Sequence, residues 1–168
     1  STRHYIDKKV DKSLLDEMLS AANLAPSWKN SQTPRFYVAT GEKSKNAVRE
    51  ALPEFNRKNS ENASAYIVTT VVLNRSGFDK DGTAVTEIGN GWGYYDLGLN
   101  NMALLLKATE LGISTLVMGI RDGEKLRKEF DIPETEAVVS VIAVGYTDSE
   151  IVRPKRKSVE DFAKFYED

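Results

Sequence analysis

The stretch from Trp92 to Leu111 (WGYYDLGLNNMALLLKATEL) carries apolar residues at helical spacing along its whole length. One face of the expected helix is defined by Tyr95, Leu99, Met102, Ala103, Leu106 and Leu111. The apolar surface is widened by Leu97, Leu104 and Leu105, so that the helix is apolar nearly all round. A helix of that composition belongs in a core. We therefore predict a central buried helix that ends at Gly112, because glycine is typical of helix C-termini.

Two β-branched stretches on either side of this helix predict buried strands. They run from Tyr66 to Leu73 (YIVTTVVL) and from Ala137 to Val144 (AVVSVIAV), and continuous apolar runs are typical of strands covered on both faces. Shorter strands are expected at 35–40 and 113–118, and helices at 11–24, 44–52, 122–130 and after Ser158. This order predicts an α+β fold, a three-layer α/β/α sandwich around a mixed central sheet, in a single domain over residues 1–168.

Between the first buried strand and the long helix lies a segment without periodicity, residues 74–91 (NRSGFDKDGTAVTEIGNG). It holds four glycines. Irregular stretches of this length are uncommon in compact domains unless they are functional or disordered. We therefore expect a mobile loop or lid at this place.

Residue counts exclude several kinds of site. The 168 residues include no cysteine and one histidine, His4, which excludes disulfides, thiolate or His-His metal sites and a cysteine nucleophile. The net charge of -2 and the lack of a second basic run argue against nucleic-acid binding. No stretch approaches the length of an apolar membrane span, so we expect a soluble, cytoplasmic protein. An enzyme of this composition would rely on carboxylates, hydroxyls or an organic cofactor.

Three polar clusters that are far apart in the sequence are candidates for ligand binding. They are Ser1-Thr2-Arg3, Pro26 to Gln32 (PSWKNSQ) and Lys155-Arg156-Lys157. Arginine and lysine with a hydroxyl can hold a phosphate, and asparagine or glutamine suits a ring edged with carbonyls and N–H groups. Each cluster also has a simpler interpretation: a solvated surface for the basic triplet, and a polar connection between helix and strand for Pro26 to Gln32.

Taken in order, these clusters and their neighbours resemble the flavin-dependent nitroreductase family over nearly the whole sequence. Ser1-Thr2-Arg3 resembles the end of the family's Arg-Ser-x-Arg start, and Ala25-Pro26-Ser27-x-x-Asn30-x-Gln32 resembles its A-P-S-x-x-N-x-Q segment. The other matching pieces are Asn56, Leu111-Gly112-Ile113, Met118-Gly119, Val144-Gly145-Tyr146 and Lys155-Arg156-Lys157. Two features depart from the family pattern: its first arginine has no counterpart before Ser1, and Thr33-Pro34 stands in place of Pro-Trp.

The resemblance implies an FMN site in an intertwined homodimer. The residues that it implies for the phosphate are Ser1, Arg3, Lys155 and Arg156, with Lys157 as a further candidate. For the ring, it implies a bond from Asn56 to the isoalloxazine edge and an approach of the backbone at Met118 and Gly119 to atom N5. The residues that it implies as contacts from the second subunit are Pro26, Ser27 and Asn30.

The resemblance also implies an activity. NAD(P)H would deliver hydride to flavin N5 and leave, and a nitroaromatic or quinone-type acceptor would then be reduced at the same place, in a ping-pong reaction that needs no catalytic side chain. Phe78, Trp92 and Tyr94 are candidate contacts for this small aromatic acceptor. Three functions stay open at this point: the NAD(P)H oxidoreductase, a dehalogenase-like or flavin-fragmenting relative of the same fold, and a flavin-binding module without enzyme activity.

Overall fold

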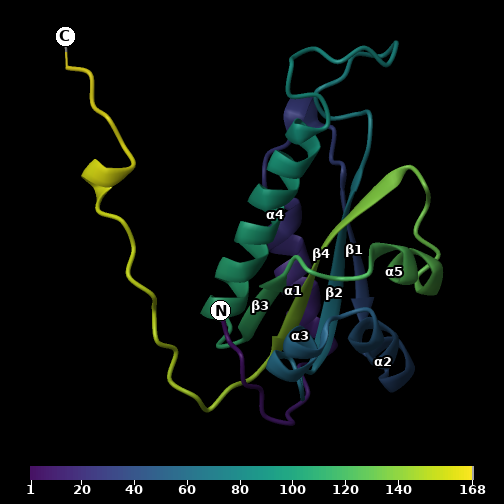
Figure 1. Cartoon of the computed structure of the whole chain (residues 1–168), viewed down its shortest axis with the longest axis vertical. Coiled ribbons are helices and arrows are strands. Elements are labelled where there is room, and N and C mark those ends of the chain that lie inside the picture. The colour runs from purple at the N-terminus through teal and green to yellow at the C-terminus, as the bar shows by residue number, and fades with distance from the viewer. Residues whose placement is uncertain (168) are drawn as a thin grey trace.

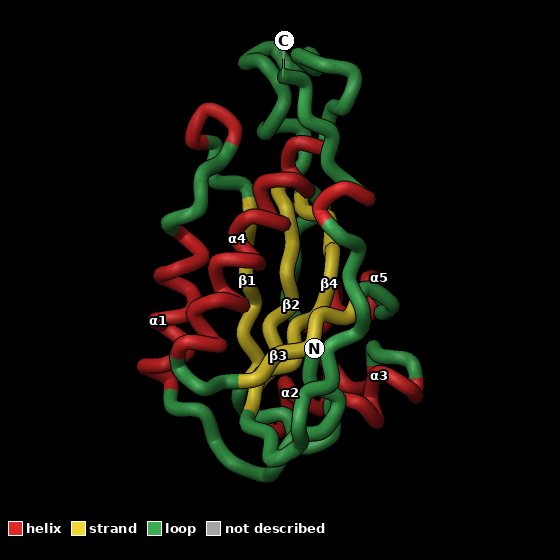
Figure 2. The backbone as a smooth tube through the Cα atoms, turned by 90° about the vertical axis from the view of Figure 1, so that its left-hand side faces the viewer, coloured by secondary structure: helices red, strands yellow, loops and turns green. Residues whose placement is uncertain are grey.

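The sheet of the protein consists of four strands. The computed structural model describes residues 1–167, and its strands are β1 (Pro34–Ala39), β2 (Ala65–Val72), β3 (Ser114–Met118) and β4 (Glu136–Gly145). The strands form one sheet (Figure 2). They lie in the order β1-β2-β4-β3, and each neighbouring pair is antiparallel. The prediction of a mixed sheet is therefore wrong for the described residues. Strands β2 and β3 do run in the same direction, but β4 lies between them, so no parallel pair forms.

Helices cover both faces of this sheet (Figure 1). They are α1 (Lys12–Asn23), α2 (Glu42–Glu50), α3 (Glu54–Asn59), α4 (Gly91–Glu110) and α5 (Gly123–Glu129). On β2, Ile67 packs in one cluster with Leu104 of α4, whereas the next residue, Val68, packs in another with Val48 of α2 and Leu126 of α5. Successive side chains of a strand point to opposite faces, so β2 is buried on both, as its apolar sequence predicts. Within residues 1–167, no helix combines the length and apolar character needed to cross a membrane.

The long helix α4 is buried on one face only. Its inner face carries Leu104 and Ala108, which pack in the same cluster as residues of α1 and the sheet. The face predicted to be inward instead lies in solvent, with Tyr95, Met102 and Leu106 60%, 53% and 58% exposed. The prediction of a central buried helix is wrong for this face. Hydropathy alone cannot distinguish a face that packs within one chain from a second apolar face of the same helix.

The segment between β2 and α4 is irregular, as predicted, but its ends are held together. The backbone N–H of Asn74 donates to Oδ1 of Asn90 at 2.7 Å, and Nδ2 of Asn90 donates to Oδ1 of Asn74 at 3.0 Å. Gly77 has a φ of 85°, and a Cβ at this position would come within 2.7 Å of the Trp92 side chain. The segment is thus a loop with a closely packed neck, formed by residues 74–78 and 86–91, and an exposed tip at 79–85. It is not a lid that is free along its whole length.

After β4 the chain leaves the body of the molecule as a long tail (Figure 1). Residues 147–167 are almost wholly exposed, and they include the large apolar side chains of Phe162 and Phe165. Ser158 caps a 3-10 turn at Val159–Asp161 through a reciprocal pair of hydrogen bonds with the last residue of that turn. The predicted cap is confirmed, but the amphipathic helix expected after it consists of this single turn.

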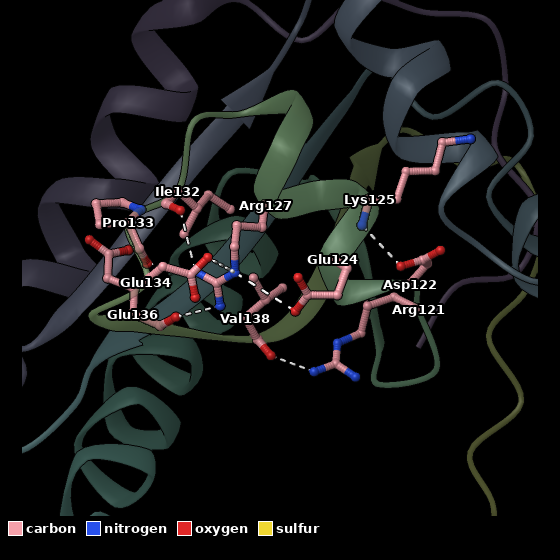
Figure 3. Close-up of polar contacts among 10 residues, drawn as sticks. All are labelled: Arg121, Asp122, Glu124, Lys125, Arg127, Ile132, Pro133, Glu134, Glu136 and Val138. Carbon is pink, nitrogen blue, oxygen red and sulfur yellow. Dashed lines mark hydrogen bonds and ion pairs between the residues drawn. The ribbon is translucent and has the colours of Figure 1, made fainter.

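Polar side chains of α5 fix the connection into β4 (Figure 3). The guanidinium of Arg127 donates to the backbone carbonyls of Pro133 and Glu136 at 2.5 and 2.8 Å. At the start of the same helix, a carboxylate oxygen of Asp122 accepts from the N–H of Lys125 at 3.0 Å, which confirms the predicted cap. The hydrogen bonds from the charged guanidinium of Arg127 are stronger than bonds between neutral groups. Arg127 therefore holds Glu136, the first residue of β4, in place.

The side chain of Glu136 is buried at the start of β4. Its carboxylate accepts from Oγ1 of Thr70 at 2.5 Å and from the hydroxyl of Tyr37 at 3.0 Å. Burial, together with the hydrogen bond to Glu136 and its negative charge, raises the pKa of Tyr37 to about 12. Burial also raises the pKa of Tyr5, and the nearby Tyr66 adds to that effect. Both tyrosines are therefore held in the neutral form by the fold.

We predict that stability falls at alkaline pH because of these two tyrosines. An unfolded tyrosine loses its proton near pH 10, whereas the folded ones keep theirs to higher pH, so their contribution is complete below about pH 10 and is lost as the pH rises above it. Tyr37→Phe should make the fall in unfolding free energy shallower, as measured by urea unfolding from about pH 8 to about pH 12. The exposed control Tyr166→Phe should keep the wild-type profile, and the same profile in Tyr37→Phe would contradict the assignment.

Candidate functional site

The N-terminal segment contacts the start of β3, the strand at one edge of the sheet. The backbone N–H of Thr2 donates to the carbonyl of Thr115 at 3.0 Å, and Thr2 is buried. Further along, the N–H of Ile6 donates to the carbonyl of Tyr146 at 3.0 Å. These two bonds fix the course of the segment and place the exposed Arg3 next to the first half of β3.

The other end of β3 meets the short helix α3. Asn56 of α3 is 7% exposed, and its Nδ2 donates to the carbonyl of Ile120 at 3.0 Å. Met118 is buried as the last residue of β3, whereas Gly119 is exposed, and a Cβ placed on it would meet no atom within 4 Å. The structure thus brings together the three predicted ring-edge residues, and it leaves the backbone at Gly119 open to a ligand.

The spacing along β3 suits an elongated ligand. Thr115, where the N-terminal segment docks, and Gly119 are four residues apart, which is about 13 Å at the rise of a strand. A guanidinium near one end can bind an anion. A carboxamide and open backbone at the other end can bind a polar ring edge.

Residues 26–33 form a tight loop between α1 and β1 (the 26–33 loop). Oγ of Ser27 accepts from the N–H of Gln32 at 3.0 Å, which closes the loop. Lys29, Asn30 and Gln32 have φ values of 46°, 55° and 48°. This left-handed region costs energy for most residues other than glycine, and such conformations persist where their surroundings hold them, often at functional sites. Backbone strain is therefore concentrated in the loop predicted to contact the ring.

Three buried polar atoms of the 26–33 loop have no hydrogen-bond partner within the described chain. They are Nε1 of Trp28, Oγ of Ser31 and Oγ1 of Thr33, and Thr33 is only 1% exposed. Buried donors and acceptors are nearly always paired in folded proteins. The loop therefore has unused hydrogen-bonding capacity, and indole and hydroxyl groups are compatible with the carbonyl and N–H groups of a flavin ring.

Aromatic rings extend from this loop along the start of α4. The ring centroids of Trp28 and Trp92 lie 4.7 Å apart, and those of Trp92 and Tyr95 lie 5.8 Å apart in an edge-to-face arrangement. Nε1 of Trp92 donates to Oγ1 of Thr86 at 2.7 Å, which ties the rings to the irregular segment before α4. Tyr94 and Tyr95 are exposed, so their rings are available for stacking with another molecule.

The two groups of predicted residues lie toward opposite ends of α4. The N–H of Trp28 donates to both carboxylate oxygens of Asp96, near the start of the helix, at 3.2 and 3.1 Å. Thr2 docks on β3 just beyond the end of the helix. From Asp96 to Glu110 the helix extends about 20 Å. Within one chain, the loop that carries Pro26, Ser27 and Asn30 is therefore separated from Ser1 and Arg3 by most of a helix.

The basic residues of the tail are also set apart. Lys155 and Arg156 are exposed, and Nη1 of Arg156 donates to the carbonyl of Pro154, within the tail itself, at 3.2 Å. The tail leaves the body of the molecule after β4 (Figure 1). The structure therefore does not join these two side chains to Arg3 within one chain, and their role at a phosphate stays a prediction.

A separate polar hollow of about 400 Å³ is lined by none of the predicted site residues. Its cations include Lys45, whose Nζ lies 2.5 Å from a carboxylate oxygen of Glu42, and Arg49, which lies 3.8 Å from the same carboxylate. These two cations already have a partner in the protein.

Comparison with known proteins identifies the family. The family model described as "Nitroreductase family" matches residues 1–146. That match covers most of the 168 residues, so the chain belongs to the nitroreductase family. It is also 27% identical over 157 residues to an Archaeoglobus fulgidus protein named "Putative NADH dehydrogenase/NAD(P)H nitroreductase", which covers 89% of this chain and 82% of that protein.

Solved structures share the fold. A nitroreductase family protein from Streptococcus pneumoniae superimposes with a TM-score of 0.83 over 99% of this chain and 95% of its own, at 22% identity. A crystal structure described as an oxidoreductase containing FMN superimposes with a TM-score of 0.77 over 89% of this chain and 73% of its own, at 25% identity. The described sheet and helices thus form a nitroreductase-type α+β fold.

We predict that the Asn56 carboxamide stabilises the end of β3. Asn56→Ala leaves the Ile120 carbonyl without its buried donor and should lower the unfolding free energy by about 1 to 2 kcal/mol, as measured by urea unfolding. Asn59→Ala removes the same group from the end of the same helix at a less buried site, and it should cost less than about 0.5 kcal/mol. Equal losses in the two variants would contradict the prediction.

Proposed function

We propose that the chain is an FMN-dependent NAD(P)H oxidoreductase that acts as an intertwined homodimer and reduces nitroaromatic or quinone-type acceptors. The observation that carries the proposal is the row of candidate binding groups beside β3. In this row, Arg3 lies near the first half of the strand, and Asn56 lies beside the open backbone of Gly119 at its end. Membership of the nitroreductase family supports the activity. The archaeal relative is named for NAD(P)H, and one similar structure contains FMN.

In this proposal, the phosphate of FMN is held at the start of the row. Arg3 supplies a guanidinium, which can donate two parallel hydrogen bonds to a phosphate, and Ser1 adds a hydroxyl. Lys155 and Arg156 complete the neutralisation when the tail is placed by the assembled dimer. All four side chains are exposed, so no internal contact has to be broken to reach a ligand except the bond from Arg156 to Pro154.

The ring edge is held at the other end of the row. The Nδ2 atom of Asn56 is engaged by Ile120, so its Oδ1 atom is the group that would face a ring N–H. The backbone at Met118 and Gly119 would approach atom N5, because no side chain at Gly119 obstructs it. Hydrogen-bond donors near the pyrimidine edge of a flavin tune its reduction potential.

A homodimer would supply the part of the site that one chain lacks. Two copies related by a twofold axis, with their α4 helices antiparallel, would bring the 26–33 loop of one copy toward β3 of the other. The exposed stripe of Tyr95, Met102 and Leu106 offers the apolar surface that such a contact needs. Pro26, Ser27 and Asn30 of the second copy would then contact the ring, and the apolar tail would pack on the partner and complete the three-layer sandwich.

When bound, FMN supplies the redox chemistry, which is hydride uptake from NAD(P)H at N5 and delivery to the acceptor in ping-pong order. The protein's own part is to bind, orient and exclude water. Asn56 would fix the ring edge, and the exposed ring of Tyr94, with the half-buried ring of Trp92 beside it, offers a stacking surface for a planar acceptor. The irregular segment before α4 limits the space above them.

The direct test is spectroscopic. The purified protein should bind FMN, absorb at flavin wavelengths and bleach with NADH or NADPH in the absence of oxygen. Binding without bleaching would instead indicate a flavin-binding module, and the absence of flavin binding would contradict both functions. Turnover with nitroaromatics, quinones and halotyrosines would separate the proposed activity from that of a dehalogenase-like relative.

We predict that the tail contributes to phosphate binding. Arg156→Ala should weaken FMN binding by about 2 kcal/mol, because a charge-assisted contact to the phosphate is lost, as measured by fluorescence titration of the flavin-free protein. Lys164→Ala removes one positive charge from the same exposed tail and should leave the affinity within about twofold of the wild type. Wild-type affinity in Arg156→Ala would refute the phosphate assignment.

A further inference from the structure

A buried carboxylate joins the two segments that border the proposed ring site. Asp96 of α4 is 2% exposed. Its oxygens accept from the backbone N–H of Trp28 at 3.2 and 3.1 Å, and Oγ of Ser76 donates to Oδ2 at 2.5 Å. Trp28 belongs to the 26–33 loop and Ser76 to the neck of the segment before α4. One side chain therefore holds three stretches of chain together.

The burial of Asp96 makes these bonds strong. A carboxylate removed from water depends on the hydrogen bonds that replace its hydration, and bonds to an ionised acceptor are stronger than neutral ones. The same two segments are also linked by Lys29 and Asp79, whose charged atoms lie 3.5 Å apart, but these side chains are 66% and 58% exposed. Exposed ion pairs contribute little, so Asp96 is the stronger tie between the segments.

The 26–33 loop needs such a tie. Its left-handed residues Lys29, Asn30 and Gln32 are retained only if neighbouring contacts hold the backbone in that conformation. Within the loop, the bond from Gln32 to Ser27 closes one side. The bond from Trp28 to Asp96 fixes the other side to the rigid helix α4, directly beside Ser27.

We propose that Asp96 is a positioning residue that holds the 26–33 loop and the neck of the segment before α4 together as one unit. The inference rests on the proposed function for the identity of the ring. Asp96 itself touches neither flavin nor acceptor. It acts through its hydrogen bonds with the backbone of Trp28 and the hydroxyl of Ser76. A change at the neck is thereby transmitted to the loop that contacts the ring.

The first test compares two substitutions of the same type. Asp96→Asn keeps the shape of the side chain but removes the negative charge that strengthens the bonds from Trp28 and Ser76, and it should weaken FMN binding by about tenfold or more. Asp79→Asn removes the exposed tie between the same segments and should change the affinity by less than about twofold. Equal affinities of Asp96→Asn and the wild type would overturn the proposal, and thermal unfolding of both flavin-free variants confirms that they are folded.

The second test uses Ser76→Ala, which keeps the bond from Asp96 to Trp28 and removes only the bond from Asp96 to the neck. It should raise the acceptor KM about threefold or more with little change in kcat and FMN affinity, an effect that a general loss of stability would not produce. Combined with Asp96→Asn, it should add nothing further to KM, because both substitutions break the same link. Full additivity of the two effects would overturn the proposal.

A third measurement separates this inference from the proposed function. Hydrogen exchange of the flavin-free protein should show faster exchange in Asp96→Asn at the Trp28 amide and around residue 76, but not in β2 or β4. If wild-type protein binds no FMN, the proposed function fails, while faster exchange at both places still supports the shared anchor. Unchanged exchange at the Trp28 amide or around residue 76 would overturn the proposed role of Asp96, whether or not FMN binds.

Discussion

The rigid length of α4 sets the layout of the protein. A helix of twenty residues extends about 30 Å and cannot bring its ends together. The 26–33 loop is tied to its start, and the N-terminal segment docks on the strand that follows its end. The apolar stripe on the outer face of the helix is a surface that a single copy of the chain leaves uncovered. The unpaired polar atoms of the 26–33 loop, in contrast, are buried within the chain.

Local features of the fold could be predicted from the sequence, and features set by distant contacts could not. All four strands lie within a residue or two of their predicted bounds, because continuous β-branched runs and flanking glycines are local patterns. The caps at Asp122 and Ser158 are local as well. Helix α3 was missed, since six residues are too short for periodicity. Its signals are Pro53 and Glu54 at its start and Arg57 and Lys58 at its end. The strand order, and with it the wholly antiparallel pairing, depends on tertiary contacts.

The candidate site shows the same division. The family resemblance implied Asn56, Met118 and Gly119 as contacts of the ring, and the structure places these residues near one another. The carboxylate of Asp96 was not found, because its partners lie 68 and 20 positions away and a single acidic residue within an apolar helix has no distinguishing pattern. Buried polar groups of this kind are visible only when burial and geometry are known. They fix the irregular segments, where hydrophobic packing gives little direction.

The crowding at Gly77 restricts where the segment before α4 can change in length. A methyl group there would come within 2.7 Å of the carbonyl oxygen of Gly89 as well as of Trp92, so the two sides of the neck could not remain in contact. Beyond the neck, all of residues 79–85 are exposed. The entropy of closing a loop grows slowly with its length, so insertions or deletions are inexpensive at the tip alone. The length of residues 79–85 can thus change while the packed neck beneath them keeps its shape.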